Sequence, residues 1–163
     1  MNSTTSKHQT SITLDERVPL VRITREFDAP ADQVFRAHTD SDLVVRWLGP
    51  EKAAMRIETW DCRTGGAYRW VDESDPGTPQ WFHGSFHDVL PEQRVVVQTF
   101  TWEGMPDSVT LERLVVTDLG DGRSRLESTS LVDSFEARDA FVASGMEHGV
   151  VEGYEKLDRL LGA

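Results

Sequence analysis

The chain has 163 residues, of which 38% are hydrophobic and 28% charged, and its formal net charge is −11. This size favours one domain with a substantial core, and no stretch approaches the roughly 20 apolar residues of a membrane helix. The acidic excess argues against binding to nucleic acids or anionic membranes, because both carry negative charge. Cys62 is the only cysteine, which excludes an intrachain disulfide and a cysteine-cluster zinc site. A cytoplasmic protein is expected.

The first part of the chain contains a tail, a strand and two helices. Residues 1–16 are polar and lack the apolar core of a secretion signal, so we expect a poorly ordered tail ahead of one domain over residues 17–163. Alternating apolar and polar residues predict a strand over residues 20–30. Apolar residues at helical spacing follow, and the polar interruption at residues 40–42 predicts two short helices.

Six further strands are predicted along the middle of the chain. Each is rich in β-branched or aromatic residues, and the connectors are short and rich in Gly, Pro and Asp. Such connectors favour an antiparallel meander. The six ranges are 54–62, 67–73, 80–90, 94–102, 109–119 and 124–132. With the first strand they make seven.

The chain ends in an amphipathic helix predicted over residues 133–161. Asp133 or Ser134 suits its N-cap, and apolar residues recur on one face. A single helix of this kind has to bury its apolar face on the sheet. We therefore predict an α+β fold in which a curved, seven-stranded antiparallel sheet wraps around one long C-terminal helix.

The order of these elements resembles the helix-grip fold of the START, polyketide-cyclase and birch-pollen-allergen superfamily. Five motifs are similar to bacterial members of the family named for the activator of the heat shock protein 90 ATPase. The resemblance implies a pocket between the cupped sheet and the helix, often in a homodimer, and the family name points to a chaperone partner. It implies no set of catalytic residues. The motifs are WLGP (47–50), WDCRTGGAYRW (60–70), FHGSFHDVLPEQR (82–94), QTFTWEGMP (98–106) and SGMEHGVVEGYEKLD (144–158).

Two adjacent glycines, Gly65 and Gly66, predict the hairpin at the start of the meander, with a positive φ as the requirement. One interpretation is a turn and nothing more. The turn also sets the register of the strands that it joins. That register decides whether Trp60, Tyr68 and Trp70 face the pocket or the solvent, because a slip of one residue inverts every side chain.

His83 and His87 are candidates for acid–base chemistry, since either could be a general base inside a pocket. They lie four residues apart on a predicted strand, which is roughly 13 Å and too far for one metal ion to bind both. In the alternative interpretation, Phe82, Gly84 and Phe86 face inward and both histidines face solvent. No motif for a metal, a phosphate or a cofactor is present, and none is predicted.

Three polar residues of the later strands are further candidates. Glu112 is a third candidate base, flanked by apolar residues, and the pattern does not decide which way it faces. Ser128 and Ser130 point inward if the charged Arg125 and Glu127, which alternate with them along the strand, face solvent. Two hydroxyls in an apolar wall suit the orientation of a small ligand. In the alternative interpretation, both faces of this strand are exposed to solvent and the serines line no pocket.

Glycine recurs every four residues in the predicted C-terminal helix, at Gly145, Gly149 and Gly153. Each glycine costs about 1 kcal/mol relative to alanine in a helix interior. Two explanations stay open, namely a close approach between helix and sheet, or space for a ligand. For the second, the predicted ligand-binding residues are Trp60, Tyr68, Phe100, Ser128, Ser130, Met146, Gly149 and Gly153.

The leading functional hypothesis is the binding of a small hydrophobic or aromatic molecule between the sheet and the C-terminal helix, without a cofactor. One alternative is a co-chaperone-like interaction module that uses the outer face of the sheet. The other is an enzyme of the polyketide-cyclase or hydrolase type, with His83, His87 or Glu112 as the base.

Overall fold

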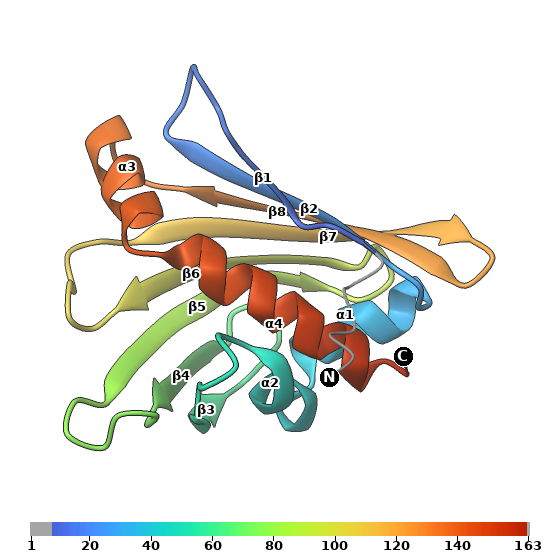
Figure 1. Ribbon diagram of the computed structural model, residues 1–163, viewed down its shortest axis with the longest axis horizontal. Coiled ribbons are helices and arrows are strands. Elements are labelled where there is room, and N and C mark those ends of the chain that lie inside the picture. Colours follow the sequence, from blue (N-terminus) through green and yellow to red (C-terminus); the bar gives the residue numbers. More distant parts are fainter. Residues whose placement is uncertain (1–7, 163) are drawn as a thin grey trace, which may run out of the picture.

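The computed structural model describes residues 8–162. Within these residues, an eight-stranded antiparallel sheet of order β1-β2-β8-β7-β6-β5-β4-β3 curves around helix α4 (Figure 1). The predicted α+β helix-grip architecture is confirmed. The strands are β1 (Ser11–Leu14), β2 (Leu20–Phe27), β3 (Met55–Trp60), β4 (Ala67–Asp72), β5 (Gln80–Leu90), β6 (Val95–Trp102), β7 (Thr110–Gly120) and β8 (Arg123–Leu131).

The sheet that the structure describes has one strand more than the seven predicted. The additional strand, β1, lies inside the range predicted as a tail and pairs with β2, from Ser11 opposite Thr24 to Leu14 opposite Val21. It is only four residues long, too short for its alternation to stand out from polar surroundings. Pairing with the edge of β2 satisfies backbone groups that would otherwise need water. Residues 1–7 of the predicted tail lie outside the described residues.

Two short helices, α1 (Ala31–Thr39) and α2 (Ser41–Trp47), connect β2 to β3 at the far edge of the sheet. The predicted break between them is confirmed. Asp40 forms it, because its side chain accepts a hydrogen bond from the backbone N–H of Asp42 and caps α2. The chain therefore changes direction between the helices.

The predicted C-terminal helix is divided into α3 (Phe135–Ala143) and α4 (Met146–Leu160), so the prediction of one continuous helix was wrong. Gly145 lies between them with a φ of 87°, a left-handed conformation that glycine adopts without steric cost. In Figure 1, α3 stands at one end of the sheet and α4 runs across its concave face. No helix among residues 8–162 combines the length and apolar character needed to cross a membrane.

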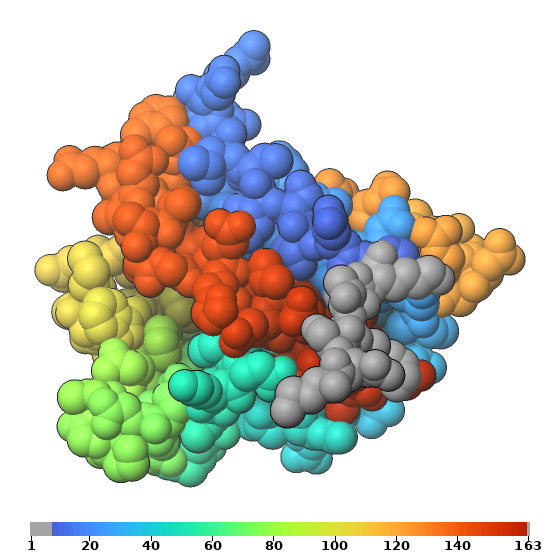
Figure 2. All heavy atoms as spheres, in the orientation of Figure 1, coloured from blue at the N-terminus to red at the C-terminus, as the bar shows by residue number. Residues whose placement is uncertain are grey.

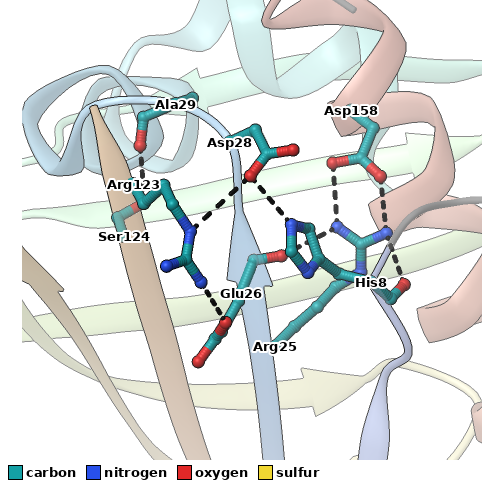
Figure 3. Close-up of polar contacts among 8 residues, drawn as sticks. All are labelled: His8, Arg25, Glu26, Asp28, Ala29, Arg123, Ser124 and Asp158. Carbon is teal, nitrogen blue, oxygen red and sulfur yellow. Dashed lines mark hydrogen bonds and ion pairs between the residues drawn. The ribbon is translucent and has the colours of Figure 1, made fainter. Parts of the chain in front are cut away.

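An ion pair between a buried arginine and a partly exposed aspartate fixes the C-terminal end of α4 to β2 (Figure 3). The Arg25 side chain is 1% exposed, and its two terminal nitrogens donate to the two carboxylate oxygens of Asp158 at 2.9 and 2.6 Å. The same guanidinium donates to the carbonyl oxygen of His8 at 3.3 Å, and His8 Nε2 lies 2.9 Å from Asp28 Oδ1. This two-point contact sets the position of α4 over the sheet.

α4 also meets the segment after α2, and the two cover the middle of one face of the molecule (Figure 2). The backbone of α4 comes close to this segment at Gly153, because a Cβ there would lie 3.3 Å from the carbonyl oxygens of both Trp47 and Gly49. A Cβ at Gly149 would lie 3.6 Å from Pro50 Cδ, which is ordinary contact. The helix therefore needs glycine for close packing at Gly153 and not at Gly149.

Candidate functional site

A cavity of about 320 Å³ lies between the concave face of the sheet and α4. Strands β2–β4 and β6–β8 line it together with all four described helices. Its volume falls within the roughly 300–1,000 Å³ of sites for small molecules. Most of the wall is apolar, and its aromatic members are Trp47, Trp60, Tyr68, Trp70, Phe100, Phe141 and Tyr154.

Every residue predicted to bind a ligand lines this cavity. The inward direction of Ser128 and Ser130 decides between the two interpretations of β8, because both hydroxyl-bearing side chains belong to the cavity wall. Contact between these residues and a ligand stays a prediction. The set comprises Trp60, Tyr68, Phe100, Ser128, Ser130, Met146, Gly149 and Gly153.

The glycine pair of the first hairpin places two of the aromatic side chains. Gly65 has a φ of 84°, and a Cβ at Gly66 would lie 1.8 Å from the carbonyl oxygen of Asp61. Both glycines are therefore required by the turn. The register that results sets Trp60 opposite Tyr68, with ring centroids 5.7 Å apart, and both rings join the wall.

A third glycine positions Tyr68. The ring of Tyr68 lies over Gly84 on β5, where an added Cβ would come within 2.5 Å of the Tyr68 hydroxyl oxygen. The hydroxyl donates a hydrogen bond to the carbonyl oxygen of Thr99 at 2.6 Å. Gly84 thus leaves the space in which the ring of Tyr68 reaches across β5 to β6.

Three polar side chains form a row on the cavity side of the central strands. Gln98 on β6 lies opposite Glu112 on β7, and Glu112 lies opposite Ser130 on β8. Nε2 of Gln98 donates to Glu112 Oε2 at 2.9 Å. We call these three residues the polar row. It crosses a wall that is otherwise mostly apolar.

Glu112 is the titratable centre of the polar row. Burial raises the pKa of its carboxyl to about 7, because loss of water penalises the carboxylate more than hydrogen bonds from Gln98 and Ser130 favour it. The side chain is half-buried and lines the cavity, so its accessible surface faces that space. Near neutral pH the group therefore exists in both forms, which suits a proton-transfer or ligand-binding role.

His38 and Tyr154 add polar groups from the helices. Nδ1 of His38 lies 2.7 Å from the carbonyl oxygen of Val34 and so donates to it, while Nε2 is buried without a hydrogen-bond partner among the described residues. Burial lowers the pKa of His38 to about 4 and raises the pKa of Tyr154 above its ordinary range. Both side chains stay uncharged at neutral pH. Sequence reasoning missed them, since each occupies the apolar side of a helix as a core residue would.

The family model described as "Activator of Hsp90 ATPase homolog 1-like protein" matches residues 28–162. The chain belongs to this family. A search of curated proteins found no match. The family assignment agrees with the resemblance carried by the sequence motifs.

Solved structures share the fold of this family member. A protein from Arthrobacter aurescens is 26% identical with a TM-score of 0.80, and the match covers 93% of this chain and 90% of that one. A protein from Rhodobacter sphaeroides is 24% identical with a TM-score of 0.83, and the match covers 94% of this chain and 97% of that one. CalU16 from Micromonospora echinospora is 18% identical with a TM-score of 0.61, and the match covers 95% of this chain and 86% of that one.

In this member of the Hsp90 ATPase activator homolog family, His83 and His87 lie outside the cavity. Both are exposed, whereas Gly84 and Phe86 beside them on β5 are buried. Nδ1 of His83 lies 3.0 Å from a carboxylate oxygen of Glu103 on the outer face. Neither histidine can act as a base on a ligand in the cavity, which leaves Glu112 from the three candidates.

The described part of this family member offers no metal site and no activated thiol. No three side chains of His, Cys, Asp or Glu gather closely enough there to hold a metal ion. Burial and the neighbouring Asp61 raise the pKa of the Cys62 thiol to about 11, so the reactive thiolate is scarce at neutral pH.

Proposed function

We propose that this protein binds a small apolar or aromatic molecule in the cavity between the sheet and α4. The observation that carries the proposal is an aromatic and aliphatic wall interrupted by one polar row. An apolar ligand gains about 25 cal/mol for each Å² of surface that it buries there. The polar row then supplies hydrogen bonds that orient it.

The neutral fluorophore N-phenyl-1-naphthylamine tests the proposal, because its emission rises in apolar surroundings. We expect a saturable increase with one site per chain. Ser128→Leu extends a side chain from β8 into the cavity and should abolish this increase. Glu127→Leu is the control, since Glu127 is the preceding residue of the same strand and is exposed. An increase that fails to saturate, or that is equal in both variants, would contradict the proposal.

Proton transfer is the second function that the site supports, and Glu112 is the observation that favours it. A carboxyl with a pKa of about 7 in a largely apolar cavity can accept a proton from a bound substrate near neutral pH. The cyclase-type alternative needs a base of this kind.

5-Nitrobenzisoxazole is a suitable substrate for testing this second function. A base removes its ring C–H proton, the C–H electron pair completes the nitrile, and the N–O bond breaks to release a nitrophenolate. We expect a rate above that of buffer, and a loss of about 100-fold or more in Glu112→Gln. A rate that is unchanged in that variant would remove Glu112 as a base.

A further inference from the structure

The cavity lining has an uneven distribution of charge. Among the described residues, Glu112 is its one acidic side chain, and the lining contains no lysine or arginine. The other two members of the polar row, Gln98 and Ser130, hold the carboxyl from the strands on either side. A ligand that reaches the polar row therefore meets a fixed carboxyl and no cation.

Two tyrosines that line the same cavity lie near enough to this carboxyl to be affected by its charge. Tyr154 on α4 interacts electrostatically with Glu112 and stacks on Trp47, with ring centroids 5.8 Å apart. Tyr68 also interacts electrostatically with Glu112 from β4. The negative face of an aromatic ring attracts a cation within about 6 Å of its centre, most strongly where water is excluded. A cation held by Glu112 would therefore share the cavity with these aromatic side chains.

We propose that the ligand is an amine whose protonated nitrogen bonds to Glu112 and whose aromatic or alicyclic body fills the apolar part of the cavity. The inference rests on the proposed function and specifies the ligand class. An ammonium group donates up to three hydrogen bonds and neutralises the carboxylate. An anion would be desolvated beside a carboxyl with no cation to pair with. The net charge of −11 also favours the approach of cations.

The pH dependence follows from the groups that face Glu112. The other two members of the polar row do not titrate. Tyr68 and Tyr154 stay protonated because burial raises their pKa values, and His38 on α1 stays neutral above pH 6 because burial lowers its pKa to about 4. The pKa of Glu112, about 7, therefore governs the charge of the cavity between pH 6 and 8.

Three ligands that share a naphthalene ring but differ in the charge of their substituent separate the effect of charge on affinity from that of apolar burial. They are 1-naphthylmethylamine, 1-naphthalenemethanol and 1-naphthoate, each titrated by calorimetry. At pH 8 we expect the amine to bind at least tenfold more tightly than the alcohol, and the carboxylate to bind most weakly. An alkylamine keeps its proton from pH 6 to 8. Its affinity should fall about tenfold from pH 8 to 6, as the ionised fraction of Glu112 falls, while that of the alcohol stays constant.

Glu112→Gln is the decisive variant. We expect it to lower the affinity of the amine to that of the alcohol and to leave the affinity of the alcohol within about twofold. Glu127→Gln, which removes an exposed carboxylate on the same sheet, is the matched control and should keep the preference for the amine. If Glu112→Gln does not fold, the change in amine affinity between pH 8 and 6 on the unaltered protein tests the same inference.

The outcomes distinguish this inference from the function on which it rests. Binding of the alcohol without preference for the amine, a preference that survives Glu112→Gln, or an amine affinity equal at pH 6 and 8 would each overturn the inference alone. Failure of all three naphthalene ligands and of N-phenyl-1-naphthylamine to bind would overturn the proposed function and the inference together.

Discussion

Gln98 donates a hydrogen bond to Glu112 across β6 and β7 at 2.9 Å, on the cavity side of the sheet. The amide favours the carboxylate, yet desolvation raises the pKa of Glu112 to about 7. Burial therefore destabilises the carboxylate of Glu112, while the hydrogen bond from Gln98 stabilises it. The energetic effect of this pair on the fold can be measured without knowing a ligand.

Glu112→Gln should change how stability depends on pH. The pKa of Glu112 rises from 4.5 to about 7 on folding, so the folded protein holds the proton more tightly than the unfolded chain. The stabilising effect of the protonated form is present below pH 4.5 and is lost as the pH rises to 7. Relative to the unaltered protein, the variant should therefore gain up to about 3 kcal/mol between pH 4.5 and 7.

Urea unfolding of both proteins across this range checks the prediction. The comparison has to be a difference, because His38 acts in the opposite direction. The pKa of His38 falls from 6.5 to about 4 on folding, so its effect raises stability as the pH increases. Subtraction removes that effect. A difference between variant and parent that does not change with pH would show that Glu112 is not desolvated.

The three glycines of the C-terminal segment should differ in their tolerance of alanine. Gly153→Ala places a methyl group against two backbone oxygens and should cost about 1–3 kcal/mol. Gly149→Ala meets only ordinary contact and should stabilise α4 by up to about 1 kcal/mol. Gly145→Ala should destabilise, because its φ is 87°. Thermal unfolding of the three variants tests this order, and equal effects at Gly149 and Gly153 would refute it.

Gly84→Ala should be among the most damaging single substitutions in the sheet. The added methyl group would lie 2.0 Å from the carbonyl oxygen of Thr99, so backbone has to move and Tyr68 has to leave its position. We expect a loss of about 3 kcal/mol or more in urea unfolding. Gly77→Ala is the control, with one contact at 3.4 Å, and should change stability by less than about 0.5 kcal/mol. Similar losses for both would mean that Gly84 is not a packing requirement.

Removing the carboxylate of Asp158 should release the end of α4 from β2. Arg25 would then keep a buried charge without its main acceptor, and we expect Asp158→Ala to cost about 3 kcal/mol. Asp139→Ala removes an ion-paired carboxylate that is 66% exposed and should cost less than about 1 kcal/mol. Urea unfolding of the two variants provides the comparison, and equal costs would contradict an anchoring role.

The sequence predicted the strands and the cavity-facing serines because both depend on local alternation. On β7, alternation left the direction of Glu112 undecided. On β7, Leu111 is 46% exposed while its neighbour Glu112 faces the cavity, an arrangement that hydrophobic patterning alone would invert. Such reversals are expected where function competes with core packing.

Two features of the fold lay beyond local patterning for other reasons. The break at Gly145 depends on a positive φ, which a glycine in a helical pattern does not reveal. Arg25 lies on the inward side of β2, where the distant Asp158 provides the carboxylate that pairs with its charge. This second feature depends on a contact between segments far apart in the chain.

The position of a bound aromatic molecule shows whether the cavity between the sheet and α4 is the binding site. Nuclear Overhauser effects between N-phenyl-1-naphthylamine and the methyl groups of labelled protein give that location. We predict contacts to Leu114 and Val150, which line the cavity from β7 and α4. Contacts instead to Leu111 and Val109, both 46% exposed, would place the molecule outside the cavity and contradict the account.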